Sequence, residues 1–420
     1  MRRALKVLKW VLLVLLLPVV AWVAFNGPWA DAPARPRPPL LLQAPLTPGQ
    51  PSAFALLRDK SLQNDEPDKA PWQCGQKSPI DCTPVWLAQG PALREQLKSI
   101  GPLADVCETA SAEGVSWTEP ELKLPKTNPA AVEIPQFKNI TRCLRWLRAQ
   151  ATLAVLDGDD ARAMQYLRRA DQAVRGSLGG AQTLIGHAVA WSMSLAQWQN
   201  VAALARVRPQ LARPLLELLR PLDPSALSTA RWISFESGVY QAIQRDMHSS
   251  CDAIRVGAGE YRDWLDHLWC QGRLGLLPEL TAQEMDAYFL QVAEQSRDGA
   301  VNAAVNGMNA SDPEPSPWAW RNTVGHVLAV VARPHWASYV KRQADVELLR
   351  QAAVLVVELT IDPVPAERRQ AWFNAQKLRP EIKSRLSMTD AGLLEVRLLR
   401  EDSDKAEPLR LALSDATRKH

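Results

Sequence analysis

The sequence predicts a mainly α-helical chain. We expect an antiparallel multi-helix assembly, a small C-terminal antiparallel β meander and one N-terminal transmembrane helix. Three observations predict this architecture. An uncharged apolar run covers Trp10–Phe25. From residue 136 onward, apolar residues recur at intervals of three and four, the period of an amphipathic helix. After residue 385 the period changes to two, which is typical of strands.

The N-terminal apolar run has the length of a membrane anchor. The uncharged segment Trp10–Ala30 has 21 residues, which at about 1.5 Å each span roughly 30 Å, the thickness of a bilayer core. The alternative is a cleaved signal peptide, because Ala30-Asp31-Ala32 and Ala32-Pro33-Ala34 have small residues at the spacing of a cleavage site. Four cations before the run predict a cytoplasmic N-terminus and an exported body: Arg2, Arg3, Lys6 and Lys9.

Charge and composition restrict the partners of the exported part. Residues 1–25 hold four of the 49 lysines and arginines and no acid, so the remaining 45 cations balance the 45 Asp and Glu residues. Nucleic-acid binding relies on clustered cations, so we expect no nucleic-acid partner. The apolar fraction of 47% is ordinary for a globular protein and allows a large core.

The chain is predicted to divide into five segments. Residues 1–25 form the cytoplasmic tip and the anchor, and residues 26–51 form a linker with eight prolines. Such a linker favours an extended spacer with a reach of up to roughly 80 Å. Residues 52–135 are loop-rich, with short helices separated by Gly-Pro pairs. Residues 136–380 form the helical body, and residues 381–420 form a small β appendage.

The helices of the body follow from apolar spacing and turn residues. Asp157-Gly158-Asp159 predicts a turn after the first helix, and Gly179-Gly180 predicts the end of the second. The segment 181–205 contains no formal charge but many polar residues, so we expect a buried core helix over 182–205 and not a second membrane span. Further helices are predicted near residues 209–220, 225–247, 260–270, 282–298, 318–332, 335–359 and 365–377.

The last part of the chain alternates apolar and polar residues. Leu386 and Met388 flank Ser387, and a similar alternation continues through Leu394–Leu398 and Leu409–Leu413. Asp390-Ala391-Gly392 supplies turn residues between the first two runs. These features predict the antiparallel meander.

Six cysteines follow the anchor, an even number that predicts disulfides in an oxidising compartment. Short separation favours Cys74 with Cys82 and Cys251 with Cys270. Cys107 and Cys143 then form the third pair, which ties the loop-rich region to the helical body. Because Cys143 lies on the apolar stripe of its helix, a buried free thiol is the alternative for that residue.

Two H-x-x-C pairs offer a second interpretation of four of these residues. His248 and Cys251 repeat the spacing of His267 and Cys270, and together they could supply four zinc ligands. The alternative is a disulfide beside two bystander histidines, which an oxidising compartment favours. We therefore expect neither a metal ion nor another cofactor.

The segment Trp232–Ser237 contains the candidate catalytic residue Glu236. Glu236-Ser237 on a predicted helix resembles the Glu-Ser start of the lytic transglycosylases, and that resemblance implies a general acid acting on a glycan. The glycine-leucine-glutamine segment of that family is not found at its expected distance. The alternative is a helix acid with a structural partner.

The layout of the chain suggests its function class. An anchor, a proline-rich spacer and a helical body resemble the lipase-specific foldases, which are steric chaperones, although their Arg-x-x-Phe-Asp-Tyr signature is absent. The chain is more similar to uncharacterised membrane-anchored, mainly α-helical periplasmic proteins of Gram-negative bacteria, a resemblance that implies no known activity. We expect a non-catalytic interaction or scaffold protein at the inner membrane, with a protein partner in the envelope. A peptidoglycan hydrolase using Glu236 and a steric chaperone are the alternatives.

Overall fold

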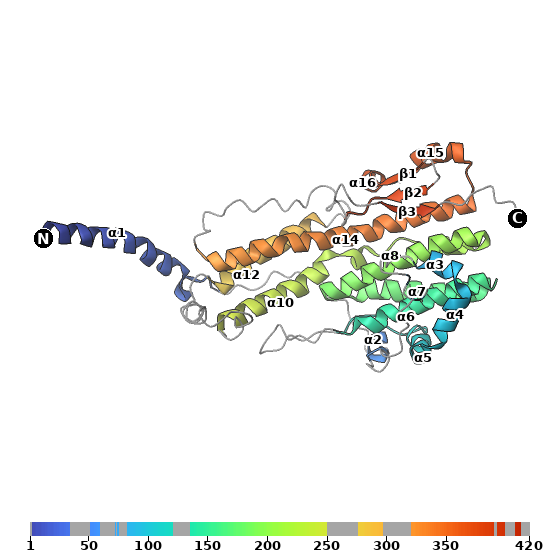
Figure 1. Ribbon diagram of the computed structural model, residues 1–420, viewed down its shortest axis with the longest axis horizontal. Helices are drawn as coiled ribbons and strands as arrows, with labels where there is room; N and C mark the ends of the chain where they lie inside the picture. Colours follow the sequence, from blue (N-terminus) through green and yellow to red (C-terminus); the bar gives the residue numbers. More distant parts are fainter. Residues whose placement is uncertain are drawn as a thin grey trace.

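The structure, a computed structural model, is an elongated helical body from which the N-terminal helix projects (Figure 1). The helices α14, α8, α7 and α6 follow one another across the body, each packed on the next. The residues described are 2–33, 51–58, 72, 74, 82–120, 135–249, 276–296, 321–389, 393–399 and 408–412.

The expected hairpin at the start of the body is confirmed. Helix α6 (Phe137–Leu156) and helix α7 (Asp160–Gly180) pack along each other. Between them, Gly158 adopts a φ of 75°, a conformation that glycine reaches without strain. The Asp159 side chain then accepts a hydrogen bond from the Arg162 N–H at 3.0 Å, so it caps the start of α7.

The uncharged segment after this hairpin is a buried core helix, as predicted. Helix α8 (Leu184–Val207) lies between α7 and α14, and Trp191 and Trp198 are at most 2% exposed. One of its buried polar residues has two partners within the core: Asn200 donates hydrogen bonds to Thr83 at 2.9 Å and to Thr152 at 3.2 Å. These bonds offset the cost of burying the amide.

The longest helix corrects one prediction. We expected two helices near 318–332 and 335–359, separated at Pro334, but α14 (Thr323–Ile361) runs without a break through that proline. A proline removes one helical hydrogen bond, and the loss can be outweighed where the rest of the helix is well packed. Here the part after Val340 is buried against α8 and the short helix α9 (Ala212–Leu218).

Short helices lie around α6: in Figure 1, α2 and α5 lie on the side of α6 away from α14, whereas α3 lies toward α8. Helices α3, α4 and α5 contact α6 directly. Their bounds are α2 (Ala53–Leu56), α3 (Thr83–Ala88), α4 (Gly90–Lys98) and α5 (Gly101–Ala110).

Two of the predicted cysteine pairs are confirmed. Cys107 on α5 and Cys143 on α6 form a disulfide with their Cα atoms 5.4 Å apart, so the free-thiol alternative for Cys143 is wrong. Cys74 and Cys82 form a second disulfide with a Cα separation of 5.1 Å. Cys251 and Cys270 lie outside the described residues.

The end of the body nearest α1 contains α10 and α12 (Figure 1). Helices α10 and α12 pack together, and α12 also contacts α14. The remaining helices are η4 (Pro209–Leu211), η5 (Pro224–Leu227), α10 (Thr229–Ser249), α12 (Pro278–Gln295), α15 (Ala366–Ala375) and α16 (Pro380–Lys383).

The C-terminal meander is confirmed as a three-stranded antiparallel sheet in the order β1-β2-β3. Leu386 pairs with Val396, and Leu394 pairs with Leu411. The sheet packs on α14, and just beyond β2 the Leu399 N–H donates to the Asp345 carboxylate of α14 at 2.6 Å. The strands are β1 (Leu386–Met388), β2 (Leu393–Val396) and β3 (Leu409–Ala412).

Helix α1 (Arg2–Asn26) projects from the body, and its described side chains over residues 13–20 are exposed. Among the described residues, no helix is long and apolar enough to cross a membrane. The predicted span Trp10–Ala30 is described only in part, because the side chains of residues 1–12 and of Leu15 lie outside the description.

The residues directly after α1 are attached to the body. After the single turn η1 (Pro28–Ala30), the Asp31 carboxylate accepts hydrogen bonds from the N–H groups of Glu279 at 3.1 Å and Leu280 at 3.0 Å. Asp31 therefore satisfies free amides at the start of α12. Residues 34–50 of the predicted linker lie outside the described residues.

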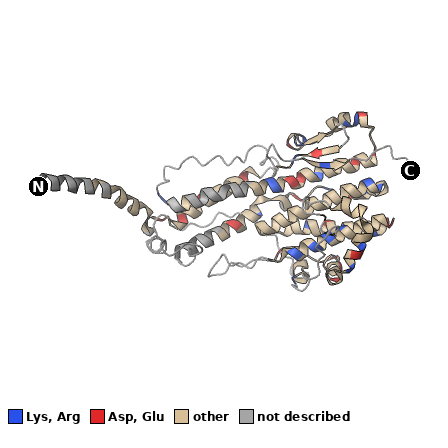
Figure 2. Cartoon of the chain, viewed as in Figure 1, with Lys and Arg blue, Asp and Glu red and all other residues tan. Residues whose placement is uncertain are grey.

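Both signs of charge are spread over the described helices of the body (Figure 2). This distribution agrees with the balance of cations and acids beyond residue 25.

Candidate functional site at the start of helix α8

Two carboxyl groups, the buried Glu119 and the half-buried Glu236, meet the first turn of α8. Glu119 comes from the segment that follows α5, and Glu236 comes from the middle of α10. Both accept hydrogen bonds from backbone N–H groups of residues 182–184. The start of an α-helix leaves N–H groups without helical partners and carries a partial positive charge, so carboxylates are stabilising there.

Glu119 makes the larger set of contacts. One carboxylate oxygen accepts hydrogen bonds from the N–H groups of Gln182 at 2.8 Å and Thr183 at 3.0 Å. The other accepts a bond from the Thr183 hydroxyl at 2.7 Å, and that hydroxyl in turn caps the Gly186 N–H at 2.8 Å. The Glu119 N–H also donates to the Gly180 carbonyl at 3.0 Å, so the segment is held at both ends of the α7–α8 connection.

Two glycines permit this approach. A Cβ on Gly180 would overlap the backbone of Thr118, and a Cβ on Gly186 would overlap the Glu119 carboxylate. Any larger residue at either position would push the 118–119 segment away from α8. The prediction that Gly179-Gly180 ends a helix is confirmed, and the second glycine also provides room for a distant segment.

Glu236 accepts a hydrogen bond from the Leu184 N–H at 3.1 Å. Burial, with a smaller contribution from the nearby Glu119, raises the pKa of Glu236 to about 7 against the opposing effect of the Leu184 N–H. Burial also raises the pKa of Glu119, although its three hydrogen bonds to Gln182 and Thr183 oppose the change. Glu236 therefore exchanges its proton close to neutral pH.

His187 lies in the first turn of α8, and its pKa is shifted in the opposite direction to that of Glu236. It is 1% exposed, and its ring lies 5.8 Å from that of Trp191. Burial, with a smaller contribution from the Arg231 guanidinium, lowers the pKa of His187 to about 3, and the backbone of Ala181 opposes the change. The imidazole is therefore neutral at physiological pH.

The sequence-predicted candidates have different outcomes. Glu236 lies in the site, but the adjacent Ser237 is directed to α12, where its hydroxyl donates to Asp286 at 2.7 Å. The side chain of His248 and the whole of Cys251, His267 and Cys270 lie outside the described residues. Within the described part of the chain, no group of His, Cys, Asp and Glu residues could hold a metal ion.

Sequence reasoning missed Glu119 and His187. Glu119 belongs to the region 52–135 that the sequence predicts to be loop-rich, yet its side chain is fully buried. One usable signal was present: a helix with no acid in its first turn, preceded by Thr183, whose free N–H groups require acceptors from elsewhere.

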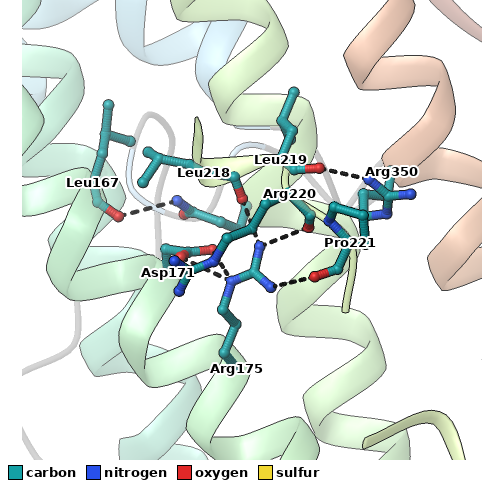
Figure 3. Close-up of polar contacts among 9 residues, drawn as sticks. Leu167, Asp171, Arg175, Leu218, Leu219, Arg220, Pro221 and Arg350 are labelled. Carbon is teal, nitrogen blue, oxygen red and sulfur yellow. Dashed lines mark hydrogen bonds and ion pairs between the residues drawn. The ribbon is translucent and has the colours of Figure 1, made fainter. Parts of the chain in front are cut away.

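A second charged cluster lies at the C-terminal end of helix α9, which packs on α8. Figure 3 shows Arg175 of α7 beside the turn at residues 218–221. Its guanidinium pairs with Asp171 at 2.9 Å and donates to the carbonyls of Leu218 at 2.9 Å, Arg220 at 2.9 Å and Pro221 at 3.2 Å.

Arg350 of α14 approaches the same turn from the opposite side (Figure 3). It donates to the Leu219 carbonyl at 2.5 Å and pairs with Glu347 through two bonds at 2.7 and 2.8 Å. Two guanidinium groups thus satisfy the carbonyls at the end of α9, which is the arrangement that the helix dipole favours.

Comparisons with known proteins give no match to a protein-family model, to a curated protein or to a solved structure. The arguments for function below therefore depend on the residues of this chain alone.

Proposed function

We propose that this chain is a membrane-anchored interaction or scaffold protein of the bacterial envelope, without catalytic activity. In this proposal α1 lies in the inner membrane with its N-terminus in the cytoplasm, and the helical body lies in the periplasm and binds another protein. The observation that carries the proposal is the uncovered apolar surface of α1. Six of its described aliphatic residues are 45–61% exposed: Leu13, Val14, Leu16, Leu17, Val19 and Val20. A bilayer would cover this surface.

The attachment at Asp31 adds a geometric argument. Asp31 directly follows the apolar segment in the sequence, and its carboxylate caps the start of α12. The body would therefore be held close to the membrane. The Arg321 guanidinium supports the same junction through the Ala30 carbonyl. A rigid junction of this kind would present a fixed face of the body to a partner in the envelope.

The cysteines support export. The disulfides Cys74–Cys82 and Cys107–Cys143 are typical of proteins outside the cytoplasm. The role as a non-catalytic interaction protein is supported by the charged groups of the two clusters, which bind backbone groups of neighbouring helices. Glu119 and Glu236 hold the start of α8, and Arg175 and Arg350 hold the end of α9, so these groups serve the packing of helices.

A reporter fusion tests the topology. An enzyme that is active only in an oxidising compartment, fused after His420, is expected to be active, and a reporter that requires the cytoplasm is expected to be inactive there. Replacing Leu16 and Val20 together by arginine should release the body from the membrane fraction, because each arginine at the helix centre costs about 3 kcal/mol on insertion. A cytoplasmic reporter that is active after His420 contradicts the proposal.

One observation favours a peptidoglycan hydrolase as the second candidate. A general acid must hold its proton near neutral pH, and the pKa of Glu236 is raised to about 7 by burial. If Glu236 is that acid, Glu236→Gln abolishes cleavage of purified peptidoglycan while the fold is retained. Glu217→Gln, an exposed change on α9, serves as the control. Intact peptidoglycan after incubation with the wild-type chain removes this candidate.

A further inference from the structure

A polar pocket of about 620 Å³ lies where the end of α7, the turn after α9 and the start of α10 meet. Its wall contains three arginines, one acid and several small apolar residues: Arg175, Arg220, Arg231, Asp223, Leu222 and Ala226. The volume falls within the range of about 300–1,000 Å³ that small-molecule sites occupy. Glu119 and Glu236 are not part of this wall, so the pocket is distinct from the site at the start of α8.

Arg175 builds the wall of the pocket but has little bonding capacity left. Its Nε pairs with Asp171, and its two terminal nitrogens donate to three carbonyls of the turn at residues 218–221 (Figure 3). It therefore fixes the shape of the turn that carries the next arginine.

Arg220 and Arg231 retain free donors. Arg220 is exposed, and no described residue accepts a hydrogen bond from its guanidinium. Arg231 donates one bond from Nη1 to the Gly179 carbonyl, and its Nε is buried without a partner among the described residues. A guanidinium has five N–H donors, so both side chains can still bind an oxyanion.

The local charge balance also favours an anion. The three arginines of the wall face Asp223 within the wall and Asp171 behind it, and Asp171 pairs with Arg175 and also interacts with the charge of Arg220. Burial lowers the pKa of Arg231, and Asp223 opposes that change, which indicates a cation whose charge is incompletely compensated. Helix α10 begins at Thr229, so Arg231 lies in its first turn, where the helix dipole adds positive potential.

We propose that this pocket binds the phosphate group of a small soluble organic phosphate, with Arg220 and Arg231 donating to its oxygens. Two guanidinium groups and a helix start match a doubly charged oxyanion better than a single carboxylate. The pocket is larger than a phosphate ion, and Leu222 and Ala226 provide apolar contacts for the remainder of the molecule. This binding is independent of the membrane attachment proposed above.

Titration calorimetry of the full-length chain in a neutral detergent tests the proposal, with phenyl phosphate as the probe. Phenyl phosphate is expected to bind at one site, and Arg220→Ala is expected to weaken binding at least about tenfold because a charge-assisted contact is lost. Arg213→Ala removes an exposed arginine from α9 outside the pocket and should leave the affinity within about twofold. Asp223→Asn should strengthen binding about threefold by removing a competing anion.

Four outcomes overturn the proposal. Equal phenyl phosphate affinities of Arg220→Ala and Arg213→Ala would show that the probe binds elsewhere, and no binding by the wild-type chain would exclude the site. Equal affinity for benzoate, which has the same ring with a carboxylate, would contradict the preference for phosphate. Binding of dihexanoyl phosphatidic acid without binding of phenyl phosphate would assign the pocket to a lipid.

Discussion

The start of α8 and the end of α9 are both held by charged side chains from other helices, but their charges are compensated differently. At the end of α9, each arginine has its own carboxylate: Arg175 pairs with Asp171, and Arg350 pairs with Glu347. At the start of α8, the groups that lower the pKa of Glu119 and Glu236 are hydrogen-bond donors and not cations.

The difference shows that correct placement in the helix dipole does not by itself keep a buried carboxyl group ionised. Both clusters have the charge that the dipole favours. Burial raises the pKa of Asp171 above its usual value, although Arg175 and Arg220 oppose this rise. Burial of Glu236 is opposed by a single N–H group, and its pKa reaches about 7. We therefore expect the start of α8 to make the stability of the chain depend on pH near neutrality.

The largest effect is expected from breaking the pair at the end of α9. Arg350→Met leaves Glu347 without its cation and the Leu219 carbonyl without its donor, at sites that are at most 14% exposed. Removing one partner of a buried ion pair costs about 3–5 kcal/mol. Urea unfolding of the full-length chain in detergent measures the loss.

Arg410→Met is the matched control for Arg350→Met. Arg410 also pairs with a glutamate, Glu395 at 3.0 Å, but its side chain is 61% exposed. An exposed pair contributes at most about 1 kcal/mol. Equal losses for the two variants would contradict the distinction between the buried and the exposed arginine.

Glu236→Gln is expected to have the next largest effect. In the folded chain Glu236 binds its proton more tightly than an unfolded glutamate with the ordinary pKa of 4.5. This group therefore stabilises the fold fully below pH 4.5, and the contribution is lost as the pH rises to about 7. The neutral amide of the variant imitates the protonated carboxyl group, so Glu236→Gln should be more stable than the wild type at pH 8 by about 2–3 kcal/mol and similar to it near pH 5.

The exposed Glu217→Gln is the control for this change and should retain the pH profile of the wild type. Unfolding in urea at several pH values between 5 and 8 separates the two variants. A Glu236→Gln variant with the same dependence of stability on pH as the wild type would show that Glu236 does not carry a raised pKa.

The comparison also shows which features the sequence could predict. The turn at Gly158, the hairpin of α6 and α7 and the alternation in β1–β3 depend on residues close together in the chain, and they were predicted. The Cys107–Cys143 pair was reached by pairing the nearer cysteines first. These features follow from local spacing and from simple counting.

Features that depend on distant residues were missed. The carboxylate of Glu119 is buried because Gly186, 67 positions later in the sequence, leaves room for it. Helix α12 begins at Pro278, four residues before its predicted start, and its first N–H groups are satisfied by Asp31 from the other end of the chain. Helix α14 continues through Pro334 because tertiary packing outweighs the local preference of proline. No periodicity within one segment contains this information.

The smallest expected effect concerns His187, and it has the opposite sign. The pKa of His187 is lowered by burial from 6.5 to about 3, so the unfolded chain binds the proton more tightly. Its contribution to stability is present above pH 6.5 and is lost as the pH falls. Acidification to pH 5 should therefore cost about 2 kcal/mol at this residue. Over the same range, Glu236 and Glu119 stabilise the fold as the pH falls, so the two effects oppose each other.

Single variants at the start of α8 should expose these opposing effects. The wild-type chain is expected to change little in stability between pH 6.5 and pH 5. Glu236→Gln should lose stability over that range, because His187 then acts with little opposition, whereas His187→Phe, which keeps the packing on Trp191, should gain it. The titration of the His187 ring protons by NMR gives its pKa directly. Parallel pH profiles for the two variants, or a His187 pKa near 6.5, would show that the two groups are not buried together in the way that the start of α8 places them.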